Sequence, residues 1–297
     1  MAEIAVNVVL FTLVDEKNLR ASGWSVDLLS PAVDPDTLGM SLWAVTRKGA
    51  PESKRELPGS PVLPGERVQD AARRVVRDEL GIDGKIMLRD VKFFDDPNRD
   101  QGAHVVSFVY YGFVAFEELR GILGGKDQVG LELVNSSQFI DEFKRGKGQG
   151  SLGEFDGVSR FGYRVVPGPT RGHERYDTTH LHGGRLLALD HDDMVFYAWR
   201  KFRRLFQGRV DTFRMLGINP LGESFRLSEL QEFADVARGV ETQRDQFRRE
   251  MLGDLESSYL SLSSNIDTSR RGKPAQTYTL KSWADPRASK LSDVDED

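Results

Sequence analysis

A charged segment at residues 59–82 (GSPVLPGERVQDAARRVVRDELGI) holds the side chains of this sequence that are best suited to chemistry. Apolar and small residues recur in it at helical spacing and a glycine ends the pattern, so we predict a helix over 67–80. Asp78 and Glu79 lie three and four positions after Val75, so the three residues share one helix face. Carboxylate oxygens grouped on a helix are the hard donors that Mg²⁺ requires. Val75 interrupts that group with an aliphatic side chain.

The same segment resembles the Nudix box, whose pattern is G-x5-E-x7-R-E-U-x-E-E-x-G-U, with U aliphatic. Glu66 and Arg74 match the early glutamate and the arginine, and Glu79 matches the second glutamate of the pair. Asp78 replaces the first glutamate of the pair, and Val75 replaces the glutamate that follows the arginine. The resemblance implies a relative of enzymes that hydrolyse diphosphates linked to another group. In these enzymes the carboxylates of the helix hold Mg²⁺ or Mn²⁺.

The two replacements predict a damaged metal centre, because one carboxylate is missing and another is shorter. The loss of a catalytic carboxylate typically lowers the rate by orders of magnitude. We therefore expect no catalytic residue and no required metal or cofactor, with residual Mg²⁺ left open at Glu66, Asp78 and Glu79. Two alternatives stand beside this hypothesis: an active Nudix hydrolase of ADP-ribose-like nucleoside diphosphate derivatives, and a helix that only packs on a sheet.

The segment after the box, FFDDPNRDQGAHVVSFVYYGFV, resembles the Nudix-related transcriptional regulators of NAD metabolism, the NrtR type. The resemblance covers most of residues 4–116 and 186–281. It implies that the Nudix domain binds ADP-ribose or a related NAD derivative as an effector, or another sugar or nucleotide. Arginine presents a planar fork of donors to phosphate oxygens. The ligand-binding residues expected on this basis are Arg47, Arg55 and Arg99 for the diphosphate, and Phe94 and Tyr110 for the adenine or ribose.

Structural roles compete with these assignments. Tyr110 and Tyr111 fit simple alternation in a strand, with one side chain in a core and the other facing out. Arg99 could be a turn residue in solvent. Asp190 precedes a predicted helix, and we favour an N-cap role for it over a ligand role.

The C-terminal part predicts helices over 225–238 and 242–252, with Ser228 as the N-cap of the first. Strands at 257–262 and 275–280 flank a basic loop. The pattern resembles the winged helix of the same family. A helix fits the DNA major groove, where arginine can pair with guanine and glutamine with adenine. The DNA-binding residues expected are Gln243, Arg244, Gln246, Arg248, Arg249, Arg270, Arg271 and Lys273.

Length and composition bound the organisation of the chain. Its 297 residues suggest two domains, and the lack of cysteine excludes disulfides and thiolate metal sites. We predict a Nudix-like α/β/α sandwich with a mixed sheet over 1–220, interrupted by an insertion at about 117–185. Within that insertion 117–123 and 136–145 read as short helices. A winged helix-turn-helix domain follows over 221–281, and then a disordered tail over 282–297.

The net charge of −5 argues against a protein that coats nucleic acid by bulk charge, but it allows a local basic patch. We see no signal peptide and no apolar run that could span a bilayer. The sequence therefore predicts a cytoplasmic regulator, most simply a repressor. It would act as a homodimer on a double-stranded DNA operator and sense an ADP-ribose-like effector.

Overall fold

The computed structural model describes the chain in segments that fall into two compact units, Met1–Arg204 and Leu205–Asp297. The described residues are 2–15, 40–48, 55–83, 86–97, 99–100, 102–123, 131–135, 140–144, 156–159, 163–167, 174–178, 187–207, 224–238, 242–252, 260–267 and 275–280. The predicted domain boundary at 220–221 lies outside these residues, as does the predicted tail.

The first unit is built on a seven-stranded mixed sheet. Its strands are β1 (Glu3–Asp15), β2 (Met40–Lys48), β3 (Arg55–Glu56), β4 (Gly59–Pro61), β5 (Arg89–Phe94), β6 (Val105–Phe113) and β7 (Leu131–Asn135). The order is β3-β2-β1-β6-β5, with β4 paired to β1 and β7 paired to β2. β1 runs parallel to β6 and antiparallel to β2, so the longest strand lies at the centre.

β1 buries side chains on both faces of the sheet. Val8 and Leu10 belong to the core that includes the apolar face of α2 (Val68–Leu80). Phe11 packs instead on Phe202 of α4 (His191–Gln207), with ring centres 5.3 Å apart. A strand covered on both faces requires apolar residues at successive positions, which explains the unbroken apolar run at the N-terminus.

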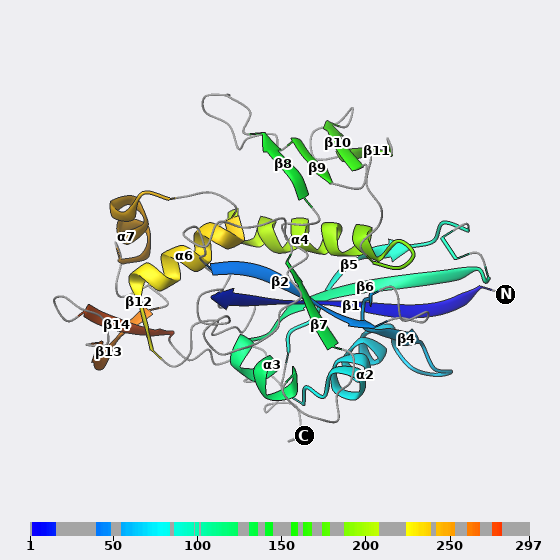
Figure 1. Cartoon of the computed structure of the whole chain (residues 1–297), viewed down its shortest axis with the longest axis horizontal. Coiled ribbons are helices and arrows are strands. Elements are labelled where there is room, and N and C mark those ends of the chain that lie inside the picture. The colour runs from blue at the N-terminus through cyan, green and yellow to red at the C-terminus, as the bar shows by residue number, and fades with distance from the viewer. Residues whose placement is uncertain are drawn as a thin grey trace, which may run out of the picture. The chain divides into compact units, whose positions relative to one another are not determined.

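Helices cover the two faces and complete the sandwich. α2 and α3 (Phe116–Leu123) lie on one side of the sheet and α4 lies on the other (Figure 1). Phe113 of β6 stacks on Phe202, and Leu119 of α3 is buried in the opposite core. The α/β/α sandwich predicted for this part of the chain is confirmed.

The predicted insertion is divided between two sheets. α3 and β7 belong to the main sandwich. A separate four-stranded sheet follows in the order β11-β10-β9-β8. Its strands are β8 (Ile140–Lys144), β9 (Asp156–Ser159), β10 (Tyr163–Pro167) and β11 (Glu174–Thr178). The helix predicted over 136–145 is wrong. A helix of two turns is marginal without packing, whereas pairing with β9 satisfies the backbone of β8.

The second unit combines two helices with a three-stranded sheet. The elements are β12 (Phe225–Arg226), α6 (Leu227–Arg238), α7 (Arg244–Leu252), β13 (Leu260–Asp267) and β14 (Ala275–Leu280). The strand order is β12-β14-β13, and both pairings are antiparallel. The buried core includes Phe225, Phe233 and Phe247, with Tyr278 from β14.

The strong sequence patterns correspond to elements of the structure, and the short helix predicted at 117–123 is found as α3. The sequence also predicts strands at 4–13, 42–46 and 105–116 and a helix over 190–206. These are confirmed within a few residues as β1, β2, β6 and α4, and so are α2, α6, α7 and β14. β13 overlaps the strand predicted at 257–262 and continues to Asp267. β5 was not predicted, because its charged sequence RDVKFF suits the edge position that it occupies. The sequence also predicts a weak strand at 25–29, and these residues lie outside the described part of the chain. None of the helices in the described ranges is long and apolar enough to cross a membrane.

Candidate functional site

The loop of the Nudix-like box that precedes α2, residues 62–67, is bound to α2 by a bidentate ion pair. Arg74 donates to both carboxylate oxygens of Glu66, at 2.8 and 2.9 Å, and also to the carbonyl of Pro61 at 2.9 Å. The backbone N–H of Leu63 donates to the same carboxylate at 2.9 Å. Gly65 turns the chain between them with φ 80°, a value that glycine adopts without strain. Glu66 and Arg74, both predicted from the box pattern, therefore meet.

This pairing sets the protonation of Glu66. The hydrogen bond from Arg74 comes first and that from the Leu63 N–H second, and together they lower the pKa of Glu66 to about 2. A carboxylate held by an arginine fork stays ionised and orders its loop.

The other box positions do not converge on one site. Val75 is 1% exposed and packs in the core beneath the sheet. Asp78 is exposed, and its carboxylate accepts a 2.7 Å hydrogen bond from the neighbouring Arg77. The helix is regular, so positions 75, 78 and 79 share one face as the spacing predicts, but along that face Val75 is buried, Glu79 is half-buried and Asp78 is exposed.

Glu79 is the half-buried carboxylate of the box. It accepts the Gly59 N–H at 3.2 Å and lies 3.7 Å from Arg47, which also pairs with Glu56 at 3.4 Å. Burial is the main cause that raises the pKa of Glu79, and the charge of Arg47 opposes it. Gly59 is required at this point, because a Cβ there would come within 2.7 Å of the Val6 carbonyl oxygen.

Each carboxylate of the box is engaged by another group of the protein. Glu66 is bound by Arg74, Asp78 by Arg77, and Glu79 by the Gly59 amide. Within the described part of the chain, no three acidic, histidine or cysteine side chains are grouped in a way that could hold a metal ion. Residual Mg²⁺ binding at Glu66, Asp78 and Glu79 stays a prediction.

Arg99 is committed to a buried ion pair. Its guanidinium donates to both carboxylate oxygens of Asp190, at 2.8 and 2.7 Å, and to the Ser107 hydroxyl at 2.8 Å. The two side chains are only 3% and 11% exposed. Asp190 occupies the position before α4 and its carbonyl accepts the Met194 N–H, but its carboxylate pairs with Arg99 and does not cap the helix as predicted. The geometry favours a structural role for Arg99, and its assignment to a ligand stays a prediction.

The start of α4 is also tied to the segment before the box. The Leu57 N–H donates to Nδ1 of His191 at 3.0 Å, which makes that nitrogen an unprotonated acceptor. The Ala188 N–H donates to the Arg55 carbonyl at 2.8 Å. Leu189 adopts φ 52° in this turn, a strained value for a branched residue. The start of α4 and the backbone of Arg55 therefore lie together, while Arg47 lies with the box.

The aromatic candidates pack within the sandwich. Phe94 meets Tyr197 of α4 edge-on, with ring centres 5.8 Å apart, and the Lys92 ammonium lies over both rings. Tyr110 is half-buried against the core beneath α2. Tyr111 is 3% exposed on the other face, and its burial raises the tyrosine pKa to about 12. Alternation therefore places the two tyrosines on opposite faces, but both are covered.

In the second unit, the turn between α6 and α7 is held by side chains of α6. The Thr242 N–H donates to Asp235 at 3.0 Å, and Gln231 donates to the Thr242 carbonyl. Gln231 and Asp235 are four positions apart, so they lie on one side of α6. This spacing is visible in the sequence and could have indicated a polar contact with the turn. α6 begins at Leu227, so Ser228 lies in its first turn, not at the N-cap. The Arg226 N–H donates to Glu229, which caps the helix instead.

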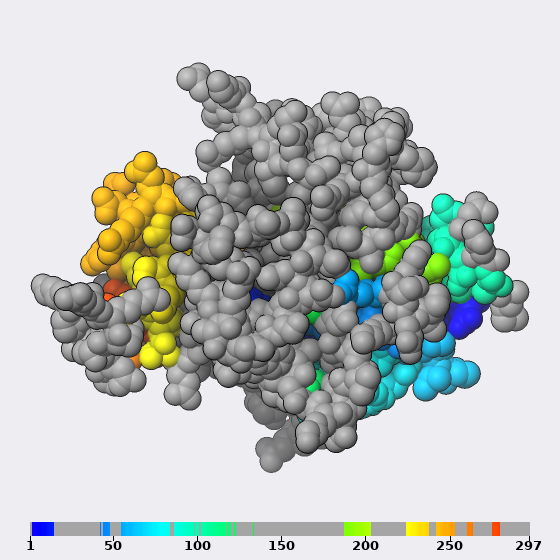
Figure 2. Space-filling model, viewed as in Figure 1, coloured from blue at the N-terminus to red at the C-terminus, as the bar shows by residue number. Residues whose placement is uncertain are grey.

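α7 presents its polar side chains outward. All five predicted DNA-binding residues on or beside it are exposed, whereas Phe247 and Met251 are buried. α6 and α7, coloured yellow to orange, form part of the visible surface in Figure 2. The other three predicted residues, Arg270, Arg271 and Lys273, lie outside the described residues.

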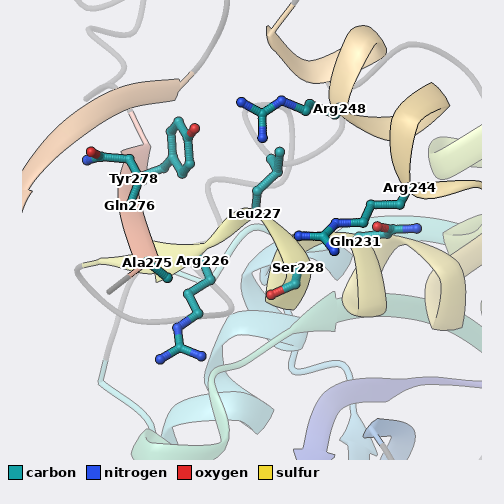
Figure 3. Close-up of a pocket in the computed structure, with 9 residues that line it drawn as sticks. All are labelled: Arg226, Leu227, Ser228, Gln231, Arg244, Arg248, Ala275, Gln276 and Tyr278. Atoms are coloured by element: carbon teal, nitrogen blue, oxygen red, sulfur yellow. The ribbon is translucent and has the colours of Figure 1, made fainter. Parts of the chain in front are cut away.

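A cleft of about 440 Å³ opens between β12, α6, α7 and β14 (Figure 3). Three arginines line it: Arg226, Arg244 and Arg248. Sequence reasoning identified the two on α7 but missed the contributions of the other elements, which are Arg226, Leu227, Ser228, Gln231, Ala275, Gln276 and Tyr278. These residues are distant along the chain and only the fold brings them together.

The Glu66–Arg74 pair predicts a pH-dependent contribution to stability. A carboxyl whose folded pKa is below its ordinary value of 4.5 stabilises the fold above that pH, and the contribution is lost as pH falls toward 2. We expect Glu66→Gln to unfold at a lower urea concentration than the wild type at about pH 6, and the gap to close between about pH 4.5 and 2. The same substitution at exposed Glu118 of α3 is the control. A gap that did not change with pH would contradict the assignment.

The buried Arg99–Asp190 pair predicts a large loss when one partner is removed. Arg99→Met and Asp190→Asn should each destabilise the fold by about 3–5 kcal/mol, because the remaining charge or dipole stays buried without its partner. The double variant Arg99→Met/Asp190→Leu should recover most of this loss. Lys201→Met, which breaks an exposed pair between α4 and Asp90, should cost less than about 1 kcal/mol. Urea unfolding measures all four, and single variants as stable as the wild type would refute the role.

The fold of this chain is similar to the folds of solved Nudix-related structures. No family model matches the sequence, and no curated protein matches it. Among solved structures, NrtR of Shewanella oneidensis complexed with a 27mer DNA is similar over 94% of this chain and 93% of its own, with a TM-score of 0.59 and 16% identity. A MutT/nudix family protein from Enterococcus faecalis is similar over 95% and 87%, with a TM-score of 0.55 and 18% identity. The chain therefore has the fold of the NrtR-type Nudix proteins.

Proposed function

We propose that the chain is a DNA-binding transcriptional regulator whose Nudix unit binds an ADP-ribose-like effector without hydrolysing it. The observation that carries the proposal is the exposed row of arginines and glutamines on α7, a helix fixed to α6 through Thr242. A helix held at a fixed angle to its neighbour, with donors facing out, is the arrangement that reads bases in the major groove.

The rest of the second unit supports a winged helix-turn-helix. A short strand, two helices and a hairpin, with the first strand paired to the last, form a small sheet beside α7. The basic residues 270–273 join β13 to β14, where a wing could meet phosphates or the minor groove. One such module offers few contacts, so we propose a cytoplasmic homodimer that acts as a repressor at a two-fold operator. The similar Shewanella protein was solved with a 27mer DNA.

The first unit supports binding without turnover. The box keeps the pair that orders its loop, but an aliphatic side chain lies in the core where the box pattern has a glutamate. We propose that Arg47 and Arg55 contact the diphosphate of the effector and that Phe94 lines its adenine or ribose. Tyr110 lies on the opposite face of the sheet, and its ligand role stays a prediction. Arg99 acts through Asp190 by fixing the loop after β5 to the start of α4.

Hydrolysis is the second candidate function. Glu79 favours it, since this half-buried carboxylate of the box has a raised pKa and a neighbouring arginine. Such an environment suits a group that accepts or releases protons.

The DNA-binding proposal predicts a loss of sequence discrimination on truncation of α7. Gln246→Ala should weaken binding to an operator from the region upstream of the chain's own gene by about 5- to 150-fold, the effect of one lost base contact. Binding to random DNA should change little, because phosphate contacts remain. Fluorescence anisotropy against labelled duplexes at fixed salt measures both affinities.

Gln69→Ala is the matched control, since this glutamine is exposed on α2 in the first unit. Its operator affinity should equal that of the wild type. Addition of ADP-ribose should release the operator from both. A wild-type chain that binds no DNA from its own or neighbouring promoters would refute the proposal.

The binding-only proposal predicts no turnover. The wild type should release no AMP from ADP-ribose with Mg²⁺ above the rate of a blank, and Glu79→Gln should behave identically, because the box carboxylates are separately engaged. Chromatographic detection of AMP is the measurement. AMP release that Glu79→Gln abolishes would establish the hydrolase instead.

A further inference from the structure

The cleft of the second unit has the size and lining of a site for an anion. Its volume of about 440 Å³ lies within the range of small-molecule sites, roughly 300–1,000 Å³. Among the described side chains that line it there are three arginines, two glutamines and a serine, and none is acidic. In a chain with a net charge of −5, such a lining is a local concentration of positive charge.

Arg244 and Arg248, the two arginines of α7 that line the cleft, have no carboxylate partner in the described part of the chain. Arg244 and Arg248 are one helical turn apart, a spacing at which like charges repel. In the first unit, by contrast, Arg74 and Arg99 are each held by a carboxylate through two hydrogen bonds. An anion in the cleft would relieve the repulsion between the arginines of α7 and supply the missing acceptor.

The beginning of α6 adds donors to the same cleft. Ser228 lies in the first turn of this twelve-residue helix and lines the cleft. The guanidinium of Arg244 extends toward Ser228, and Arg248 lies on the other side of Leu227 (Figure 3). The positive end of the helix dipole favours negative charge at this point. Glu229, whose carboxylate caps the Arg226 N–H, is not among the lining residues.

We infer that this cleft binds phosphate groups, as a phosphodiester or as a free phosphorylated compound. Guanidinium forks match phosphate oxygens in pairs, and the side-chain amides of Gln231 and Gln276 can donate to others. The cleft adjoins the exposed face of α7. If the proposed function holds, the phosphate comes from the DNA backbone, and the cleft fixes the position of α7 without reading sequence. The phosphate site itself does not depend on that function.

Ser228→Asp in the full-length chain tests the cleft directly. An aspartate in the first turn suits the helix dipole, so α6 should fold while a negative charge enters the site. Inorganic pyrophosphate, followed by calorimetry, is the probe. We expect at least about a tenfold weaker affinity than in the wild type, and a comparable loss in Arg244→Gln. Gln69→Glu makes the same change of charge at an exposed position of α2 in the first unit, and it should leave pyrophosphate binding within about twofold.

DNA provides the second arm of the experiment. Removing one phosphate contact with Arg226→Gln should weaken operator and random DNA equally and lower the slope of log K against log salt by about one. If Arg226→Gln lowers the salt slope but the wild type binds no pyrophosphate, the DNA backbone is identified as the only source of phosphate. Pyrophosphate binding that only the cleft variants weaken would support the site even if no DNA were bound.

The site is refuted if neither pyrophosphate affinity nor the salt slope responds to Ser228→Asp, Arg244→Gln or Arg226→Gln. DNA binding with an unchanged slope in these variants would leave the proposed function standing and overturn the cleft alone.

Discussion

The buried ion pair between Arg99 and Asp190 is the constraint on which the first unit depends. Moving two charges out of water costs several kcal/mol per ion, and only good geometry and further hydrogen bonds offset this cost. Here the geometry is a two-pronged fork, with the Ser107 hydroxyl as an additional acceptor. The pair joins the loop after β5 to the residue that precedes α4. It therefore determines where that helix begins and which of its side chains reach the sheet.

The position of α4 set by this ion pair places its aromatic side chains against the sheet. Tyr197 meets Phe94, and Phe202, one and a half turns further on, meets both Phe11 and Phe113. These contacts form the core on one face of the sheet. The strained turn at Leu189 has the same origin, because the chain must place Asp190 against Arg99 and His191 against the Leu57 amide at once. Surrounding contacts that fix a residue from several sides are what allow such strain to persist.

Much of the fold could be predicted from the sequence, but only part of the candidate site. β1, β6 and α2 carry strong apolar periodicity, which burial enforces, so their positions were predictable. β5 and β8 have weak patterns and take their form from pairing with neighbours, which single-sequence reasoning does not reveal. Arg99 was predicted to bind a ligand because an arginine in a loop suits phosphate. Its partner lies 91 residues away, and no local spacing signals such a contact.

The Nudix-like box contains two kinds of position: those that match the pattern and those that depart from it. Glu66 and Arg74, which match the pattern, hold the loop against α2 and need no metal to do so. The departures, Val75 and Asp78, fall where the pattern places further carboxylates, and neither residue is used to fasten the loop. Substitution at these positions leaves the loop and its ion pair in place. A sandwich that keeps its shape under these changes can retain a ligand pocket, while Arg244 and Arg248 of the second unit line a separate cleft.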